Sequence, residues 1–521
     1  MKKRLKVIFP LTVAVAMVAV AGQATSATSA PTGAATPAAT ANCVKYAGVE
    51  STGNKNSMDP AQQPSSQNSL NVNASYDRLT TVDDNWKVLP SLATSWKASA
   101  GGKVWTFQLR KGVKFHNGKP FTSADVVYTF RRVIDPKTGS EGASQMTFLK
   151  PGGIKAAGPY AVKFTTAKPV AELPLLITNK NTFIVQSGAS TATLRTKGAG
   201  TGPFIVQSFA PTKQVQTFTR NPNYWRKGYP KAPCLQLYVI QEANSMLAAL
   251  QTGQVDFAQQ VAYEIVPALK RNSSVKLTAT GPSTSMVMPM WVDTAPFDKL
   301  AVRQALKKVV DRKQMVANAL LGYGVIGDDN PVPPTSPDAW RKTVPGPDVA
   351  GAKKLLAAAG YSSSNPLKVD IYAADMIPGV LNMVQLFKQQ AAKADIQVNV
   401  ITGPASEYWD NVWLKHPFQV SGWSARPAGL ALSIAYLRNA PYPETHWKVP
   451  AFDALIQKAN TTVDPAARRA LYKRAGKMLS EQGGAIIPAF QRVVAAQRSN
   501  CSGYVPSIQF VQFDLAPLQC R

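Results

Sequence analysis

The sequence has few of the residue patterns that carry enzyme chemistry. Its 521 residues include three histidines, and none has the spacing of a metal-binding helix such as HExxH. The GxSxG turn of serine hydrolases, the GxGxxG loop of dinucleotide-binding folds and the phosphate-binding P-loop are all missing. We therefore expect no catalytic residues, no metal and no cofactor. The alternative is a hydrolase whose triad is scattered through the chain.

Long apolar segments are also scarce. After residue 21 there is no run of about 18 apolar residues, so no later segment is expected to cross a membrane. Residues 1–27 have the features of a secretion signal: a positive start, an apolar run over residues 7–21, and cleavage expected after Ala24 or Ala27. Residues 28–42 are rich in Ala, Thr and Pro and carry no charge, so we expect a disordered tether.

Acidic residues are few relative to basic ones. There are 29 Asp and Glu against 58 Lys and Arg, which gives a formal charge of +29, and the predicted signal carries only four of these positive charges. Such a charge favours anionic partners. We do not expect nucleic acid, because export removes the protein from it and no zinc-finger or RNP-type motif is present. Anionic polymers or lipid headgroups of the cell envelope fit better, and a basic surface that only serves solubility is an equally good interpretation.

Cysteine is rare as well. An even number in an exported chain predicts two disulfides, and the residues themselves leave three pairings open, with free buried thiols as the alternative. The four cysteines are Cys43, Cys234, Cys501 and Cys520.

The clearest local pattern lies between residues 92 and 130. In Val104–Leu109 apolar and polar side chains alternate, as in a half-buried strand, and glycine-containing turn pairs stand on either side. Thr122 is a good N-cap, and Asp125 three residues later suits the positive end of a helix. The helix should end near Ile134, because Pro136 cannot continue it.

Patterns elsewhere predict an α/β protein with more than one domain. About 480 residues after the tether exceed one compact core. A strand over residues 369–372, a helix over 380–394 and a strand over 396–401 favour a parallel sheet. Residues 295–316 predict an amphipathic helix whose apolar face holds Val302, Ala305, Leu306, Val309 and Val310. Residues 243–252 predict a helix that stops at Gly253.

Several of these segments together resemble one family. The stretch over residues 92–130 reads LATSWKASAGGKVWTFQLRKGVKFHNGKPFTSADVVYTF and is similar to the pattern W…FxLRxGVxFHxGxxFTAxDV. Residues 295–316, APFDKLAVRQALKKVVDRKQMV, are similar to PFxDxRVRQAxxxAIDRxxi. These patterns are hallmarks of the solute-binding proteins of peptide-type (oligopeptide, dipeptide and nickel) ABC transporters. The resemblance runs from Cys43 to nearly the end of the chain.

The resemblance implies a two-lobed type II periplasmic-binding-protein fold of the α/β class, with an extra subdomain in the first lobe. The expected first lobe comprises residues 43–75, 200–282 and 487–521, with the extra subdomain at 76–199. The second lobe is expected at 283–486.

The family's fold also implies a disulfide pairing. The strands that begin near Cys43 and Cys234 should lie side by side and parallel, so we expect Cys43–Cys234 and, for the remaining two, Cys501–Cys520. Many family members are lipoproteins, but the first cysteine here is far from the apolar run, so we expect no lipid anchor. His116 falls in the family's FHxG turn, where a structural role is expected.

One segment of the second lobe should reach the ligand. Residues 418–430, FQVSGWSARPAGL, resemble the family segment fDlxxxGWxxD, in which the tryptophan, here Trp423, lines the cleft. Packing between the lobes is the alternative role. In peptide-binding members an aspartate shortly after the tryptophan pairs with the peptide's amino group. Here Ser424 and then Arg426 follow, and no acid precedes Tyr442.

The arginine changes the expected ligand. A cation at Arg426 repels an ammonium group and is suited to hold a carboxylate or phosphate, although an arginine bonded within the hinge is an equally good interpretation. Further candidates for ligand contact are Ser424, Trp291, Asp293, Tyr408, Trp409, Asn54 and Met58. A core position is the alternative for Trp409.

The resemblance therefore implies a monomeric, exported protein that captures a small solute for an ABC permease. The expected ligand is a modified or N-blocked peptide or another organic anion. A saccharide stacked on Trp423 and Trp291 is the second choice, and a nickel complex the third. An envelope-bound receptor or adhesin with no transport role is an alternative of another class.

Overall fold

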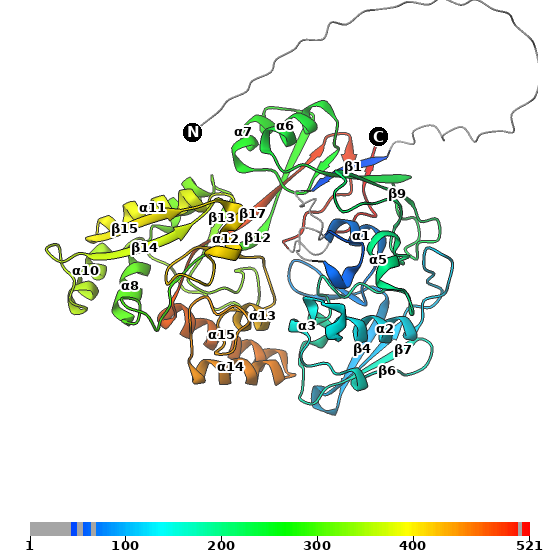
Figure 1. Ribbon diagram of the computed structural model, residues 1–521, viewed down its shortest axis with the longest axis horizontal. Helices are drawn as coiled ribbons and strands as arrows, with labels where there is room; N and C mark the ends of the chain where they lie inside the picture. The colour runs from blue at the N-terminus through cyan, green and yellow to red at the C-terminus, as the bar shows by residue number, and fades with distance from the viewer. Residues whose placement is uncertain (1–42, 49–55, 64–68, 509–512) are drawn as a thin grey trace, which may run out of the picture. The chain divides into compact units, whose positions relative to one another are not determined.

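The computed structural model describes residues 43–48, 56–63, 69–508 and 513–521 (Figure 1). The predicted signal peptide and tether lie outside these residues, as does Asn54. The compact unit of the chain is residues 42–521. In the described part of that unit, no helix has both the length and the apolar character needed to cross a bilayer.

The largest sheet joins segments from the whole length of the chain. Its order is β16-β12-β17-β11-β1-β10-β9-β8, and β13 pairs with β17. The neighbours of β1 in this order, β10 and β11, are both parallel to it, which is the side-by-side arrangement expected for the strands near Cys43 and Cys234. The strands are β1 (Val44–Gly48), β8 (Phe204–Ser208), β9 (Val215–Arg220), β10 (Cys234–Val239), β11 (Phe257–Ala258), β12 (Val275–Pro289), β13 (Gly324–Ile326), β16 (Ser421–Trp423) and β17 (Ala485–Arg498).

Two strands of this sheet are much longer than the others. β12 and β17 run antiparallel, and β17 pairs with β11 near Gln497 while β12 pairs with β16 at Ser285. The register between β12 and β17 shifts near Pro282, and such irregularities bend a sheet. These strands include the positions where the chain is predicted to cross between lobes. The exact lobe boundaries stay a prediction.

A separate four-stranded sheet lies within residues 93–165. Its order is β4-β5-β7-β6, and helix α2 packs on one face, where Phe130 meets Phe164 edge to face at 5.0 Å. The predicted capping box is present, since the amide of Thr122 donates to Asp125 over 2.8 Å. The strand and the helix predicted here are both confirmed. The elements are β4 (Ala93–Ser99), β5 (Val104–Leu109), β6 (Ile154–Ala156), β7 (Ala161–Thr165) and α2 (Ser123–Ile134).

Shorter elements lie elsewhere in the first 270 residues. Two of them, β2 and β3, pair as an antiparallel ladder. These elements are α1 (Leu70–Ser75), β2 (Thr80–Val82), β3 (Val88–Pro90), α3 (Gly142–Gln145), α4 (Leu173–Leu176), α5 (Thr191–Lys197), α6 (Ala243–Thr252) and α7 (Val266–Lys270).

The predicted second lobe has a parallel pair of strands, β14 and β15, connected by helix α11. The amphipathic helix predicted within residues 295–316 is present as α8 (Leu300–Lys308), with Val302, Ala305 and Leu306 buried, but it is shorter than that segment. Helix α8 ends at Lys308, and Asp311 is extended and accepts the amide of Gln314, so it caps a new helical segment. The elements are α8 (Leu300–Lys308), α9 (Arg312–Gln314), α10 (Val349–Ala358), β14 (Leu367–Ala373), α11 (Val380–Ala392), β15 (Ile396–Thr402), α12 (Ala405–Asn411), α13 (Ala428–Ser433), α14 (Pro450–Thr461) and α15 (Pro465–Gln482).

Both disulfides expected from the resemblance are present. Cys43 is bonded to Cys234, and their Cα atoms lie 4.6 Å apart across the β1–β10 pair. Cys501 is bonded to Cys520, and each stands in one strand of the short ladder formed by β18 (Cys501–Ser502) and β19 (Gln519–Cys520). The first bond joins positions 191 residues apart, whereas the second closes a local loop.

Candidate ligand-binding site

A buried carboxylate holds two of the tryptophans near the end of β16. Trp423 donates its indole N–H to Oε2 of Glu444 over 2.8 Å, and Trp413 donates to Oε1 over 2.8 Å. Glu444 is fully buried. Burial raises the pKa of this carboxyl group, while the two indole donors and the charge of Arg426 act in the opposite direction. Glu444 therefore fixes both rings and has no surface to offer a ligand.

The two fixed rings belong to an aromatic cluster formed by Trp409, Trp413, Trp423 and Tyr442. Ring centroids lie 6.0 Å apart between Trp413 and Trp423, and 5.2 Å between Trp413 and Tyr442. Trp409 is 42% exposed and Tyr442 is 37% exposed, so the cluster has an open side. Flat side chains held by neighbours in this way can stack on a ligand with little loss of conformational entropy.

Arg426 lies against this cluster. Its guanidinium carbon is 4.9 Å from the centre of the Trp423 ring, and Nη1 donates to the carbonyl of Ser424 over 3.2 Å. Among the described residues no carboxylate forms an ion pair with Arg426. Burial lowers its pKa to about 10, against the influence of Tyr442 and Glu444. The guanidinium therefore has N–H donors to spare beside an apolar surface.

Lys180 adds to the positive potential near Arg426. Its ammonium contacts Glu141 at 2.7 Å and the carbonyl of Gln63 at 2.9 Å. Burial lowers the pKa of Lys180, Glu141 raises it, and the charge of Arg426 lowers it further. Lys180 comes from the predicted extra subdomain and Arg426 from the predicted second lobe, so cations from two separate parts of the chain face the same region.

A cavity of about 1010 Å³ adjoins the cluster, with Tyr442 in its wall. One side is built from residues 144–176 and the other from residues 427–461. Its apolar lining includes Phe148, Leu176, Leu430 and Ile434, and its charged lining comprises Lys150, Lys168, Lys458 and Glu172. The volume accommodates a small solute of the size that binding proteins usually enclose.

Direct bonds connect the two sides of this cavity. Oε2 of Glu172 accepts the hydroxyl of Tyr472 over 3.0 Å, and Nε of Arg468 lies 3.4 Å from Oε1. Next to them the amide of Ala171 donates to the carbonyl of Asn460 over 3.0 Å. We call these contacts the Glu172 bridge. Burial raises the pKa of Glu172, while Arg468 and Tyr472 oppose that shift.

The other predicted contact residues have partners of their own. Asp293 binds His446 at 2.8 Å and Lys448 at 3.2 Å, while Trp291 stacks on His446 with ring centroids 4.2 Å apart. Both side chains therefore already have partners within the protein, outside the aromatic cluster.

Two further candidates, Tyr408 and Met58, are core residues in this structure. Tyr408 is 1% exposed, and its hydroxyl donates to the carbonyl of Val420 over 2.7 Å. Met58 is fully buried and packs with Val44 and Tyr46. Both side chains are therefore part of the core, and ligand contact at either one stays a prediction.

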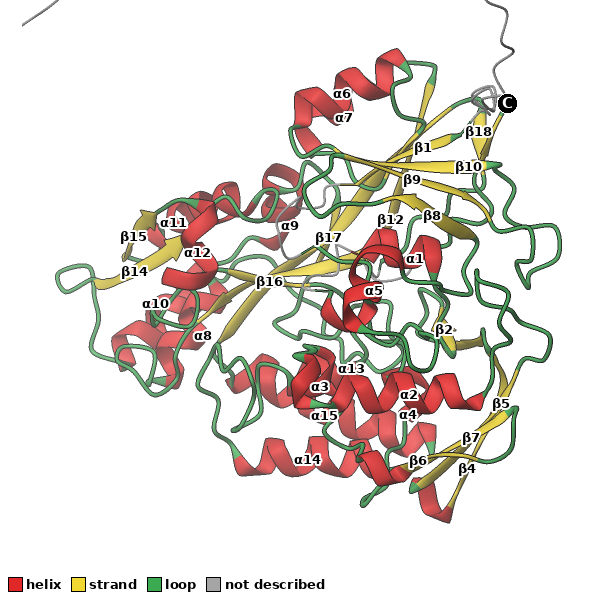
Figure 2. Ribbon diagram, turned by 45° about the vertical axis from the view of Figure 1, so that its right-hand side comes forward, coloured by secondary structure: helices red, strands yellow, loops and turns green. Residues whose placement is uncertain are grey.

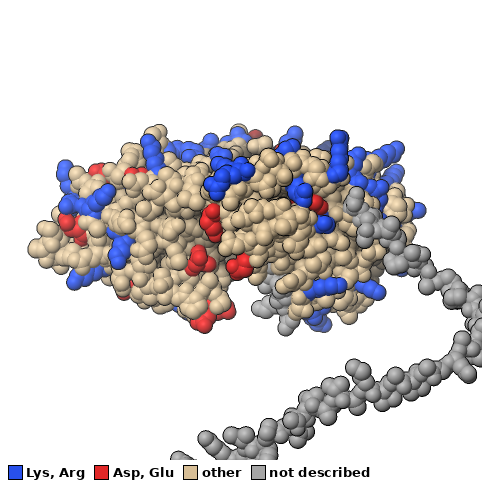
Figure 3. Space-filling model, turned by 90° about the horizontal axis from the view of Figure 1, so that it is seen from above, with Lys and Arg blue, Asp and Glu red and all other residues tan. Residues whose placement is uncertain are grey.

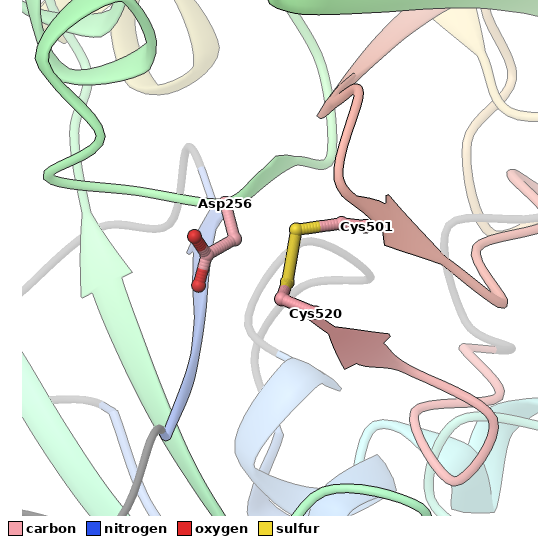
Figure 4. A group of neighbouring side chains, drawn as sticks. All are labelled: Asp256, Cys501 and Cys520. Atoms are coloured by element: carbon pink, nitrogen blue, oxygen red, sulfur yellow. A yellow bond between two sulfur atoms is a disulfide. The ribbon is translucent and has the colours of Figure 1, made fainter.

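Two further features bear on metal binding. His116 contacts the carbonyl of Gly202 at 3.0 Å, and burial lowers its pKa to about 4, so it is a neutral structural group in its turn. Within the described residues, one group of metal-type side chains comes together: Asp256, Cys501 and Cys520 (Figure 4). The two sulfur atoms are bonded to each other, so they are not thiolate ligands while the disulfide is intact.

Sequence reasoning missed Glu444, Lys180 and Tyr442. Glu444 stands 21 residues after Trp423 in a loop that matches no motif, and Lys180 comes from a distant part of the chain. No spacing rule connects these residues with Trp423. The one usable signal is that a buried indole N–H requires an acceptor.

The fold is that of a two-lobed periplasmic binding protein. It has two long strands in one large sheet, and a cavity with walls from separate segments lies beside the aromatic cluster. Solved structures share this fold: HbpA2 from Haemophilus parasuis has a TM-score of 0.78 at 21% identity, covering 92% of this chain and 100% of the other. A dipeptide-binding protein from Pseudoalteromonas sp. SM9913 in complex with Met-Leu has a TM-score of 0.77 at 22% identity, with the same coverage.

Sequence comparison identifies the family. Residues 87–444 match the model of bacterial extracellular solute-binding proteins, family 5. The glutathione-binding protein GsiB of Escherichia coli K12 is 26% identical over 485 residues, which cover 89% of this chain and 93% of that protein. The chain belongs to the family 5 extracellular solute-binding proteins, which bind solutes outside the cytoplasm for ABC importers. The family and fold class predicted from the motifs are confirmed.

Proposed function

We propose that the protein captures an organic anion, or a modified or N-blocked peptide, and delivers it unchanged to an ABC permease. The observation that carries this proposal is the pairing of Arg426 with the aromatic cluster. A half-buried guanidinium with spare donors binds a carboxylate or phosphate bidentately, and the neighbouring rings cover the apolar part of the same ligand. Glutathione, which the relative GsiB is named for binding, is a modified peptide with two carboxylates and a net negative charge, and its α-ammonium stands beside one of those carboxylates.

An ordinary peptide amino terminus fits the site less well. An ammonium group needs an accessible carboxylate, and the acid that touches the aromatic cluster, Glu444, is fully buried with both oxygens bonded to indoles. Arg426 and Lys180 also repel a positive group in this region. The same reasoning disfavours a cationic nickel complex.

A saccharide is the second candidate. The exposed faces of Trp409 and Tyr442 are surfaces on which a sugar ring can stack without any charge on the ligand. This candidate predicts binding that is independent of Arg426. An envelope-bound receptor or adhesin is distinguished from both by the absence of a soluble ligand.

The remaining elements of the proposal follow from the sequence. We infer a signal peptide that is removed on export, no lipid anchor, a monomer and no enzymatic turnover. Retention at the cell then depends on other contacts. The full chain has a formal charge of +29, of which the signal carries four, and the remaining +25 (29 − 4) favours anionic polymers of the envelope as the partner.

A thermal-shift screen tests the proposal. The panel comprises glutathione, N-acetylated peptides, free dipeptides, organic acids, oligosaccharides and nickel–histidine. A ligand at 100 times its dissociation constant stabilises the folded state by about 2.7 kcal/mol, which raises the melting temperature by several degrees. We expect the shift with an anion or a blocked peptide and none with free dipeptides.

Arg426→Gln isolates the proposed contact. The variant should lose the shift, whereas Arg474→Gln, at an exposed arginine of α15, should keep it. A shift that persists in Arg426→Gln, or one that only sugars produce, would exclude the anion site. Product formation during incubation with any of these compounds would exclude pure binding.

A further inference from the structure

Three lysines form a row across the open face of the four-stranded sheet. The strand register places Lys97 opposite Thr106, Thr106 opposite Lys163, and Lys163 opposite Lys155. Because paired residues on adjacent strands share a face, these four side chains point to the same side. All three lysines are exposed. With about 4.8 Å between strands, the row extends over about 14 Å.

The opposite face of this sheet is covered and apolar. Trp105, Phe107 and Phe164 alternate with the outward residues and are buried, and α2 lies on their side of the sheet (Figure 2). The outward residues of the four strands include no acid and no large exposed apolar side chain; they are Ser95, Lys97, Ser99, Val104, Thr106, Gln108, Lys155, Ala161, Lys163 and Thr165. The face is therefore flat, polar and of one charge.

The charge of the row is not neutralised within the described part of the protein. Among the described residues none of the three lysines forms an ion pair. Lys155 and Lys163 stand directly opposite each other, and like charges in that position destabilise a sheet. Figure 3 shows one face of the protein, on which basic side chains are numerous and acidic side chains are few. An ordered line of unneutralised charge matches a partner that brings its own line of negative charge.

We propose that this face docks a linear polyanion with regularly spaced phosphodiester groups, of the kind found in the cell envelope. Each lysine ammonium contacts one phosphate, and Thr106 supplies a hydroxyl between them. A lipid surface fits less well, because the face has no exposed apolar side chain to enter a membrane. This surface is separate from the solute site. It is the part of the protein through which the proposed binding to the envelope would occur.

Binding of poly(glycerol phosphate) tests the proposal. The exported chain without its signal is titrated with this polymer over a range of salt concentrations. The test variant is the triple change Lys97→Gln, Lys155→Gln and Lys163→Gln. The control removes the same charge from exposed helical positions, with Lys313→Gln, Lys388→Gln and Lys393→Gln.

We expect the test variant to bind about tenfold or more weakly at low salt. The slope of log affinity against log salt should fall in magnitude by about one for each lysine removed, so by about three in total. The control should lose less than about threefold. Unfolding midpoints of both variants verify that they are folded.

Three results would overturn the proposal. One is failure of the unchanged protein to bind the polymer. Another is an equal loss in the control variant, which would show that net charge rather than the row is responsible. The third is binding to vesicles of phosphatidylglycerol and phosphatidylcholine that requires the row while polymer binding does not. None of these results affects the thermal-shift test of solute binding.

Discussion

The indole N–H of Trp423 donates to Oε2 of Glu444 over 2.8 Å, and the carboxylate that accepts it is fully buried. The other oxygen accepts from Trp413. A single buried acid therefore sets the orientation of two rings that belong to the same aromatic cluster. Burial of an acid is costly unless its oxygens are bonded, so the acid and the rings depend on each other.

Replacing Glu444 by Gln tests this dependence. Glutamine keeps the size of the side chain but has one acceptor oxygen, so one indole N–H would face an amide N–H₂ instead of an oxygen. We expect a loss of about 1–3 kcal/mol in the free energy of unfolding, measured by urea denaturation. The same change should also weaken ligand binding, because one ring is no longer held.

Glu264→Gln is the matched control, since Glu264 is exposed. It should change stability by less than about 0.5 kcal/mol. If the two substitutions change the free energy of unfolding equally, Glu444 contributes to stability only through its charge.

The stability contributed by Glu444 should depend on pH. Its pKa is raised by burial, so the folded state holds the proton more tightly than the unfolded chain does. The stability that Glu444 contributes is therefore complete below the ordinary glutamate pKa of about 4.3. It is lost as the pH rises through the pKa that Glu444 has in the folded state. The difference in unfolding free energy between the unchanged protein and Glu444→Gln should fall from about pH 4 toward neutrality, by at most about 1.4 kcal/mol per pH unit. A difference that grows with pH would show that the pKa is lowered instead.

Local structure follows from the sequence here because local interactions determine it. Strand β5, the capping box of α2 and the parallel pair β14–β15 each depend on patterns within a few tens of residues. The helix predicted within residues 295–316 ends early for a local reason too, because Asp311 caps a new helical segment where the apolar pattern would otherwise continue. A side-chain cap depends on residues only a few positions apart, but the spacing of apolar residues does not reveal it.

The site was predictable only in part. Trp423 and Arg426 lie in one segment that resembles the family, and the structure places them in contact. Glu444, Lys180 and the wall of the cavity over residues 144–176 reach the site through the fold, from segments with no pattern in common. Residue type and spacing cannot indicate which distant residues come into contact, because strand order and the packing of separate parts of the chain determine those contacts.

The two disulfides should differ in what they contribute to stability. Cys43–Cys234 joins positions 191 residues apart and Cys501–Cys520 positions 19 apart. In the chain-entropy account a longer closed loop removes more freedom from the unfolded state, and the difference between these two loops amounts to about 2 kcal/mol. The double change to serine at Cys43 and Cys234 should therefore lower the free energy of unfolding more than the double change at Cys501 and Cys520. Equal losses in urea denaturation would show that the unfolded chain is already compact around β1 and β10.

The Glu172 bridge predicts how the two sides of the cavity separate. Tyr472→Phe removes the hydroxyl that lies 3.0 Å from Oε2 of Glu172 and 2.7 Å from Oδ1 of Asn460, and it leaves the ring in place. Losing one such bond costs about 1 kcal/mol, so the open form should become about fivefold more populated. The amide of Ala171 reports this opening directly, because its acceptor, the carbonyl of Asn460, lies on the other side.

Hydrogen exchange at single-residue resolution gives the measurement and its internal control. Exchange at Ala171 should accelerate about fivefold in Tyr472→Phe, while the adjacent amide of Val170, bonded to Gly102 within the same sheet region, should not change. Tyr128→Phe removes a hydroxyl bonded to Ala189 and should leave both amides as they are. If Val170 and Ala171 accelerate together, the substitution loosens the subdomain itself and the bridge is not what holds the two sides. A change confined to Ala171 means that the bridge biases the protein toward its closed form before any ligand binds, so part of the measured affinity is set at a distance from Arg426.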